Sequence, residues 1–171
     1  IGQLKNLKAL ELVFNITKGI PKEVQKLKKL RSLTLSIGRF ELFRGLAYFK
    51  QIEVLNMENT GLKTLPPALL KLKNLHKLYL KDNQITEFPK DLYKLRKLEE
   101  LDLTSNKLKI IPPNVCIHPR LKILRLYGNQ LKTVPDYIVG LKSLEVLDLG
   151  YNPLEQLSDR LTEMKNLRTF K

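Results

Sequence analysis

The residue types that most often perform acid–base, nucleophilic or metal chemistry are few in this chain and lie apart. His76 and His118 fall in different segments, and a lone cysteine, Cys116, excludes an intrachain disulfide and a cysteine-based zinc site. Glu99 and Glu100 are neighbours that face in different directions on a strand, so they form no acid–base pair. Phosphate-binding glycine loops, nucleophile elbows and His-Glu-x-x-His helices are absent. We therefore expect that residues 1–171 contain no catalytic site and bind no metal or cofactor.

These residues belong to a sequence motif that repeats along the chain. In its clearest copy, Leu75, Leu78 and Leu80 are followed by Asn83 and Phe88. The phrase opens at intervals of 23 residues, with a single interval of 22, at Leu7, Leu30, Ile52, Leu75, Leu98, Leu121, Leu144 and Leu167. Self-similarity of this length is typical of a solenoid. Repeat positions are numbered below from each opening residue, so that Leu75 is position 1 and Asn83 is position 9.

Each copy predicts a short strand followed by a turn. The L-x-x-L-x-L stretch alternates, which predicts leucines facing inward and a parallel sheet built from equivalent strands. A proline and two later apolar residues predict a single helical turn. Asparagine recurs at position 9, where a buried amide can satisfy loose backbone groups, in Asn15, Asn83, Asn106, Asn129 and Asn152. Gly38 and Thr60 replace it in the second and third copies, which we expect to be less regular.

The pattern L-x-x-L-x-L-x-x-N-x-L-x-x-L-P resembles the leucine-rich repeat proteins. Residues 1–7 and 72–75 are most similar to the repeats of leptospiral proteins, although plant and animal signalling proteins use a similar phrase. The resemblance implies an α/β solenoid: a curved horseshoe with a parallel sheet on its concave face and short helical turns or 3-10 segments on its convex face. It also implies a protein-interaction scaffold that is secreted or lies on the cell surface and meets host molecules.

The length and the repeats predict one leucine-rich repeat domain over residues 1–171, with about seven full repeats from Leu7 and partial repeats at both ends. Neither end has the polar sequence typical of a solenoid cap. We therefore expect either that flanking sequence is missing or that the ends pack against another molecule. An open strand edge predicts end-to-end self-association. No apolar run is long enough to span a membrane, and no secretion signal precedes Ile1.

The net charge of +14 raises the question of an anionic partner. Carboxylates and cations are nearly balanced at the outward positions of the predicted strands, so the excess lies elsewhere. Cations at position 22 should line one edge; they are Lys28, Lys73, Arg96, Lys142 and Lys165. This edge either binds an acidic polysaccharide or anionic surface, or is a solvated edge that keeps the protein soluble. No aromatic residue interleaves with it, so we expect no sequence-specific nucleic-acid binding.

Equivalent outward positions in neighbouring copies should bring side chains together across the sheet. Position 5 places Arg125 between Asp102 and Asp148, with Lys171 after them. Position 3 places Lys77 beside Glu100, and position 7 places Lys81 beside Glu58. These pairs are interpreted either as exposed ion ladders or as contacts for a partner.

Aromatic residues give the sharper prediction. Tyr79, Tyr127 and Tyr151 should point outward, with Tyr127 and Tyr151 in one patch, and Phe14 with Ile37 in a second. Tyrosine and arginine often dominate interface energies, whereas a single exposed tyrosine can simply reflect strand propensity. The predicted set for binding a protein partner on the concave face is Tyr79, Arg125, Tyr127, Tyr151, Phe14 and Lys81.

Overall fold

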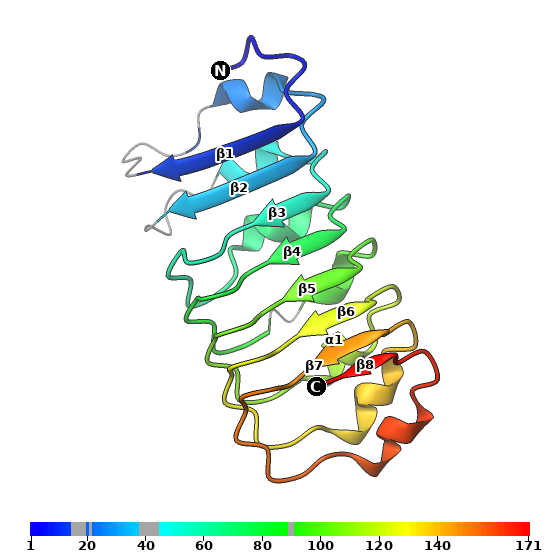
Figure 1. Cartoon of the computed structure of the whole chain (residues 1–171). Helices are drawn as coiled ribbons and strands as arrows, with labels where there is room; N and C mark the ends of the chain where they lie inside the picture. Colours follow the sequence, from blue (N-terminus) through cyan, green and yellow to red (C-terminus); the bar gives the residue numbers. More distant parts are fainter. Residues whose placement is uncertain (15–19, 21, 38–44, 89–90) are drawn as a thin grey trace.

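A computed structural model describes residues 1–14, 20, 22–37, 45–88 and 91–171, and the predicted solenoid is confirmed there. Eight parallel strands form one open sheet in chain order (Figure 1). The strands are β1 Ala9–Phe14, β2 Ser32–Ile37, β3 Val54–Asn56, β4 Lys77–Tyr79, β5 Glu100–Asp102, β6 Ile123–Arg125, β7 Val146–Asp148 and β8 Thr169–Phe170.

The strands pair in the register that the repeat predicts. Leu78 of β4 lies opposite Leu55 of β3 and Leu101 of β5, so position 4 forms one column across the sheet. The leucines of this column in β2 to β7 are fully buried. Because side chains alternate along a strand, this register turns positions 3 and 5 to the opposite face, which is called the sheet face below.

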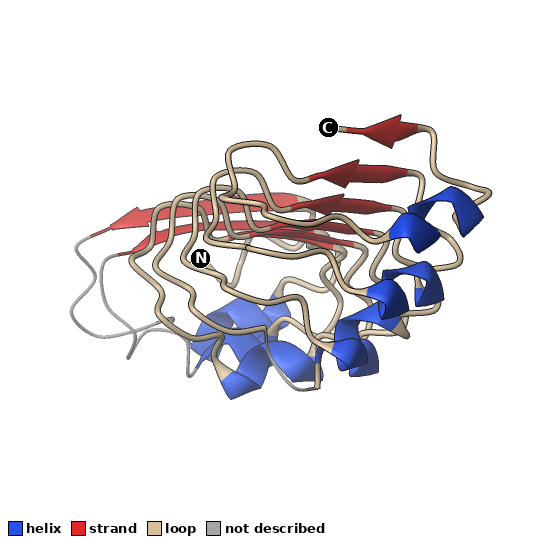
Figure 2. Cartoon of the chain, turned by 90° about the horizontal axis from the view of Figure 1, so that it is seen from below, coloured by secondary structure: helices blue, strands red, loops and turns tan. Residues whose placement is uncertain are grey.

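Short helical turns lie on the other side of the core, away from the sheet, as predicted (Figure 2). They are the 3-10 turns η1 Lys22–Lys26, η3 Pro67–Lys71, η4 Leu92–Lys94, η5 Asp136–Gly140 and η6 Asp159–Glu163, and the single-turn helix α1 Pro113–Cys116. Prolines such as Pro66, Pro112 and Pro135 stand immediately before these turns in extended conformation, which stops the preceding segment from becoming helical. Position 18 then points a residue such as Leu69 or Val115 into the core.

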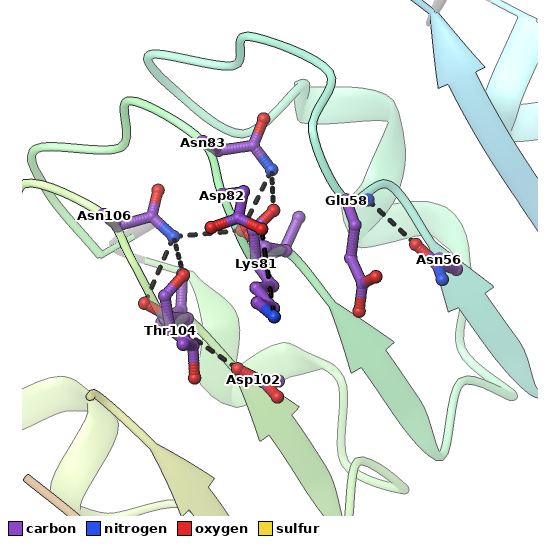
Figure 3. Close-up of polar contacts among 10 residues, drawn as sticks. Asn56, Glu58, Lys81, Asp82, Asn83, Asp102, Thr104 and Asn106 are labelled. Carbon is purple, nitrogen blue, oxygen red and sulfur yellow. Dashed lines mark hydrogen bonds and ion pairs between the residues drawn. The ribbon is translucent and has the colours of Figure 1, made fainter. Parts of the chain in front are cut away.

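Position-9 asparagines join each copy to the one before it. Asn106 Nδ2 donates to Leu80 O of the preceding copy at 3.0 Å and to Leu103 O of its own copy at 3.1 Å. Its Oδ1 accepts from the backbone N–H of Ile85 in the preceding copy at 2.9 Å. Figure 3 shows the amide nitrogens of Asn83 and Asn106 donating to carbonyl groups at the ends of their own strands. The same arrangement recurs at Asn129 and Asn152.

The third copy keeps part of this arrangement without asparagine. Thr60 Oγ1 donates to Met57 O at 2.9 Å, which replaces the bond that an asparagine amide makes to its own strand. A threonine hydroxyl cannot also reach the preceding copy as a donor. Asn15 and Gly38, the position-9 residues of the first two copies, lie outside the described residues.

Removing one buried amide should therefore destabilise the solenoid. Asn106→Ala leaves one N–H and several carbonyl groups without partners in a buried site, so we expect the free energy of unfolding to fall by about 2–4 kcal/mol. Urea unfolding followed by circular dichroism measures this change. Asn166→Ala is the control, because Asn166 is exposed and makes one bond, to Lys142 O. Equal effects of the two substitutions would contradict a structural role for the buried amides.

Candidate interaction surface

Four of the predicted partner-binding residues lie together on the C-terminal half of the sheet face. Tyr79 ends β4 and Arg125 ends β6, and both are half-buried. Tyr127 and Tyr151 follow β6 and β7 and are 39% and 82% exposed. Lys81 is also exposed and forms an ion pair with Asp82 at 3.9 Å, not with Glu58 as the repeat register predicted. The side chains of Phe14 and Ile37 lie outside the part of the chain that the structure describes.

Asparagine and aspartate at position 5 turn the chain out of the strand. Asn56, Asp102 and Asp148 each accept the backbone N–H of the residue two positions later, at 2.8, 2.9 and 3.2 Å (Figure 3 shows the first two). This side-chain turn competes with continued strand pairing. The aspartates on this row are therefore fixed by their own backbone.

Glu100 of β5 is the centre of a network on the sheet face. The residue is 7% exposed, and its two carboxylate oxygens face different partners. Oε1 accepts from Arg125 Nη1, while Oε2 accepts from Tyr79 hydroxyl at 3.2 Å and lies 3.4 Å from Lys77 Nζ. One carboxylate thus orders three side chains that come from β4 and β6.

The structure places Arg125 between Asp102 and Asp148, as the sequence predicted, and adds a hydrogen bond that the sequence did not predict. Position 5 alone places this guanidinium between Asp102 and Asp148, but its hydrogen bond goes to Glu100 at position 3. Asp102 lies 4.0 Å from Arg125, and Asp148 has Lys171 as its cation, also at 4.0 Å. Asp102 is thus the more distant partner of Arg125, and Glu100 accepts its hydrogen bond.

The network shifts the protonation equilibria of its members. Burial would raise the pKa of Glu100, but the hydrogen bond and charge of Arg125 and the charge of Lys77 outweigh burial and lower it. Burial and the neighbouring Glu100 carboxylate raise the pKa of Tyr79. Glu100 is therefore ionised and Tyr79 is neutral at physiological pH, and the tyrosine hydroxyl is the donor between them.

Tyr127 and Tyr151 form the aromatic pair that was predicted. Their ring centroids are 5.3 Å apart with an interplanar angle of 37°. The Tyr127 ring lies against Gly150, where an added Cβ would approach its Cδ2 atom to 2.9 Å. Gly150 therefore makes the space in which Tyr127 packs across to the next copy.

The five cations of position 22 are exposed along one edge of the solenoid, where the chain enters each strand. Within the described ranges, none of them is in an ion pair with a carboxylate; they are Lys28, Lys73, Arg96, Lys142 and Lys165. Several cations at position 2 differ, because they form ion pairs with carboxylates of neighbouring copies. Arg31 pairs with Glu53 at 3.3 Å, and Lys122 pairs with Glu99 at 3.0 Å. This edge therefore carries positive charge that no carboxylate neutralises in an ion pair within the described ranges.

His118 and Cys116 lie in structural positions on the helix side of the core. His118 replaces the leucine of position 21, is 1% exposed, and its Nε2 atom lies 3.1 Å from Leu95 O. Burial lowers its pKa, so the ring is neutral at physiological pH. Burial also raises the pKa of Cys116 to about 12, which leaves an unreactive thiol.

The described residues contain neither a metal-binding cluster nor a membrane-spanning helix. No cluster of three or more His, Cys, Asp or Glu side chains there could hold a metal ion. None of the helices in those ranges has the length and apolar character needed to cross a bilayer.

Replacing the central carboxylate should destabilise the sheet face in a pH-dependent way. Glu100→Gln keeps the shape but removes the charge that Arg125 and Lys77 contact, so we expect a loss of about 1–3 kcal/mol at pH 7. Because the pKa of Glu100 is lowered in the folded state, this contribution is complete above its unfolded pKa of about 4.3 and is lost as pH falls through the folded pKa.

Urea unfolding of both proteins at pH 7 and pH 3 tests this expectation. Glu155→Gln is the control, because Glu155 pairs with Lys132 at a comparable distance but is 67% exposed. An exposed pair contributes less than about 1 kcal/mol. A difference between wild type and Glu100→Gln that stayed the same at both pH values would exclude the proposed electrostatic origin.

Comparison with solved structures identifies similar solenoids. A leucine-rich repeat protein of Leptospira interrogans is 32% identical, with a TM-score of 0.79 over 99% of this chain and 50% of that chain. The ectodomain of the Arabidopsis thaliana receptor kinase GASSHO1/SCHENGEN3, solved in complex with CASPARIAN STRIP INTEGRITY FACTOR 2, is 26% identical, with a TM-score of 0.70 over 90% of this chain and 19% of the receptor. The plant peptide hormone receptor RGFR1, solved in complex with RGF2, is 28% identical, with a TM-score of 0.72 over 98% of this chain and 28% of the receptor.

The chain therefore spans half the length of the leptospiral protein and smaller shares of the two receptors. No curated protein sequence matches it. A family model described as a leucine-rich repeat region matches residues 29–171. With that model covering most of its length and the repeat visible in its sheet, the chain belongs to the leucine-rich repeat family.

Proposed function

We propose that this chain is a non-catalytic module that binds a protein partner on its sheet face. The observation that carries the proposal is the ordered surface between β4 and β7. Glu100 holds Tyr79 and Arg125 in place, and Tyr127 and Tyr151 stand exposed beside them. Side chains that are ordered before docking lose little entropy on binding, and exposed tyrosine and arginine supply much of the energy of protein interfaces.

The family supports the same class of function. Two of the similar structures are plant receptors solved with a protein or peptide ligand. The partner proposed is a host molecule met by an exported protein, which is what the resemblance of the repeats to leptospiral proteins implies; one similar structure is a leucine-rich repeat protein of Leptospira interrogans. Buried, neutral His118 and the unreactive Cys116 thiol support a binding role over a catalytic one.

Blocking the sheet face should abolish partner binding whichever side chains contribute most. Lys81→Cys places a thiol on that face, and Ile117→Cys places one on the helix side, where Ile117 is 64% exposed. A maleimide-linked polyethylene glycol chain should react with either new thiol and leave Cys116 intact, because burial keeps that thiol protonated. The probe is an array of human extracellular matrix and cell-surface proteins.

We expect at least one saturable binder, and at least a hundredfold weaker binding when the polymer is attached at position 81 but not at position 117. Equal inhibition from both positions would reject the sheet face as the binding surface. An array without a binder would reject the host-protein class. Sedimentation velocity on the same samples tests the end-to-end self-association expected from the sequence, which neither label should prevent.

A second proposal concerns the cationic edge. Its exposed cations, which have no carboxylate partners in the described ranges, support adhesion to an acidic polysaccharide. Converting Lys73, Arg96 and Lys142 to glutamine should then lower the salt concentration at which the protein leaves a heparin column. The control converts Lys63, Lys107 and Lys109, which are exposed elsewhere, and removes the same charge. Equal elution of the two triple variants would show that the positive charge only solvates the protein.

A further inference from the structure

His118 occupies a place that the repeat gives to leucine. Position 21 holds a buried leucine in the first, third, fourth and sixth copies; these residues are Leu27, Leu72, Leu95 and Leu141. His118 takes this place in the fifth copy, two residues after α1, and is 1% exposed. A leucine would suit the fold better there, because it buries no polar atom. A residue that breaks the local rule in this way is expected at a functional or strained site.

Only one of the two ring nitrogens of His118 has a hydrogen-bond partner among the described residues. Its Nε2 atom lies 3.1 Å from Leu95 O of the preceding copy. A carbonyl oxygen can only accept, so Nε2 carries the proton of the neutral ring, and Nδ1 is the atom that would take a second proton. Nδ1 is buried and is the nitrogen without a partner. A second proton would therefore create both a buried positive charge and a buried N–H group without an acceptor.

The surroundings of the ring offer no compensating carboxylate within the described residues. The titratable groups on and beside the elements packed here are Asp91, Tyr93 and Lys94 at η4, Cys116 and Arg120 at α1 and after it, and Asp136 and Tyr137 of η5. Asp91 pairs with Lys94 at 3.0 Å, and Asp136 accepts from Ser158 Oγ of the following copy at 2.6 Å. Burial lowers the pKa of His118, and the hydrogen bond to Leu95 O opposes this effect only in part.

A charged ring reaches water only if the helix side opens. The backbone of η5 packs directly on α1, since a Cβ added at Gly140 would lie 2.5 Å from Cys116 O. The path to solvent is short, because the neighbouring Ile117 is 64% exposed. α1 is a single turn of four residues, whereas the strands are held by the sheet and by the buried asparagine amides. The contact between α1 and η5 is therefore the part that opens at the lower free-energy cost.

We propose that His118 is a pH switch: in mild acid its ring takes a second proton, moves into water and opens the contact between α1 and η5, while the sheet stays folded. Above about pH 6.5 the ring is neutral in the open and the closed state, and the closed state is favoured in full. As the pH falls below that value, the open state binds the proton and the closed state does not. The open fraction then rises by up to about tenfold per pH unit, until the buried ring is protonated as well.

Cys116 reports the opening, because its thiol is 1% exposed and lies two residues from His118. The whole chain is treated with 2,2′-dithiodipyridine, a disulfide that reacts with thiols in mild acid. The rate is divided by the rate for the same chain unfolded in urea at the same pH, which gives the open fraction. Between pH 7 and pH 5.5 we expect this fraction to rise by about fivefold in the wild type and to stay constant in His118→Leu, which restores the leucine of the other copies.

Two further variants separate charge from packing. His118→Gln keeps a buried polar side chain that does not titrate, so its open fraction should exceed that of the wild type at pH 7 but should not rise in acid. His76→Gln replaces the half-buried histidine at the start of β4 and should keep the wild-type rise. A rise that persists in His118→Leu, or that disappears in His76→Gln, would overturn the proposal. So would labelling that depends on urea as steeply as global unfolding does, because the whole fold would then open.

Discussion

A buried amide that bonds in two directions is the constraint on which this solenoid depends. Where the chain leaves each strand, it turns inward and its peptide groups lose the strand partners they would otherwise have. The asparagine of position 9 donates to the strand-end carbonyls of two consecutive copies and accepts one N–H from the preceding copy, as Asn106 does with Leu80, Leu103 and Ile85. Asparagine combines a donor and an acceptor in one short side chain, and the threonine of the third copy keeps only part of this bonding.

This internal constraint fixes the surface as well. Once the leucine column and the asparagine amides set the register, equivalent outward positions of neighbouring strands lie side by side. Long side chains of one copy then contact side chains of the next copy, and several of these contacts are ion pairs. The sheet face is therefore an ordered array before any partner arrives, which is the property that a binding module requires.

The two edges of the sheet differ in character. Cations without ion pairs stand where the chain enters the strands, whereas the exposed pair Tyr127 and Tyr151 stands beside Arg125 where it leaves β6 and β7. The entering edge provides long-range attraction for anionic groups, and the leaving edge provides short-range contact area. A partner that crossed the sheet face from one edge to the other would meet both, which makes the edges complementary parts of one proposed surface.

Residue spacing within one copy was enough to predict the repeat, the parallel sheet, the inward leucines, the short turns opposite the sheet and the buried asparagines. It also placed Tyr127 beside Tyr151. It placed Lys77 beside Glu100, which form an ion pair at 3.4 Å, but it did not bring Tyr79 and Arg125 to the same carboxylate. Repeat register puts Arg125 level with Asp102 and Asp148, and the tertiary structure keeps the ion pair with Asp102 but gives the hydrogen bond of Arg125 to Glu100 at position 3. The left-handed conformation of Tyr151 likewise emerged only from the folded chain. Packing between copies decides such pairings and backbone angles, and no single copy contains that information.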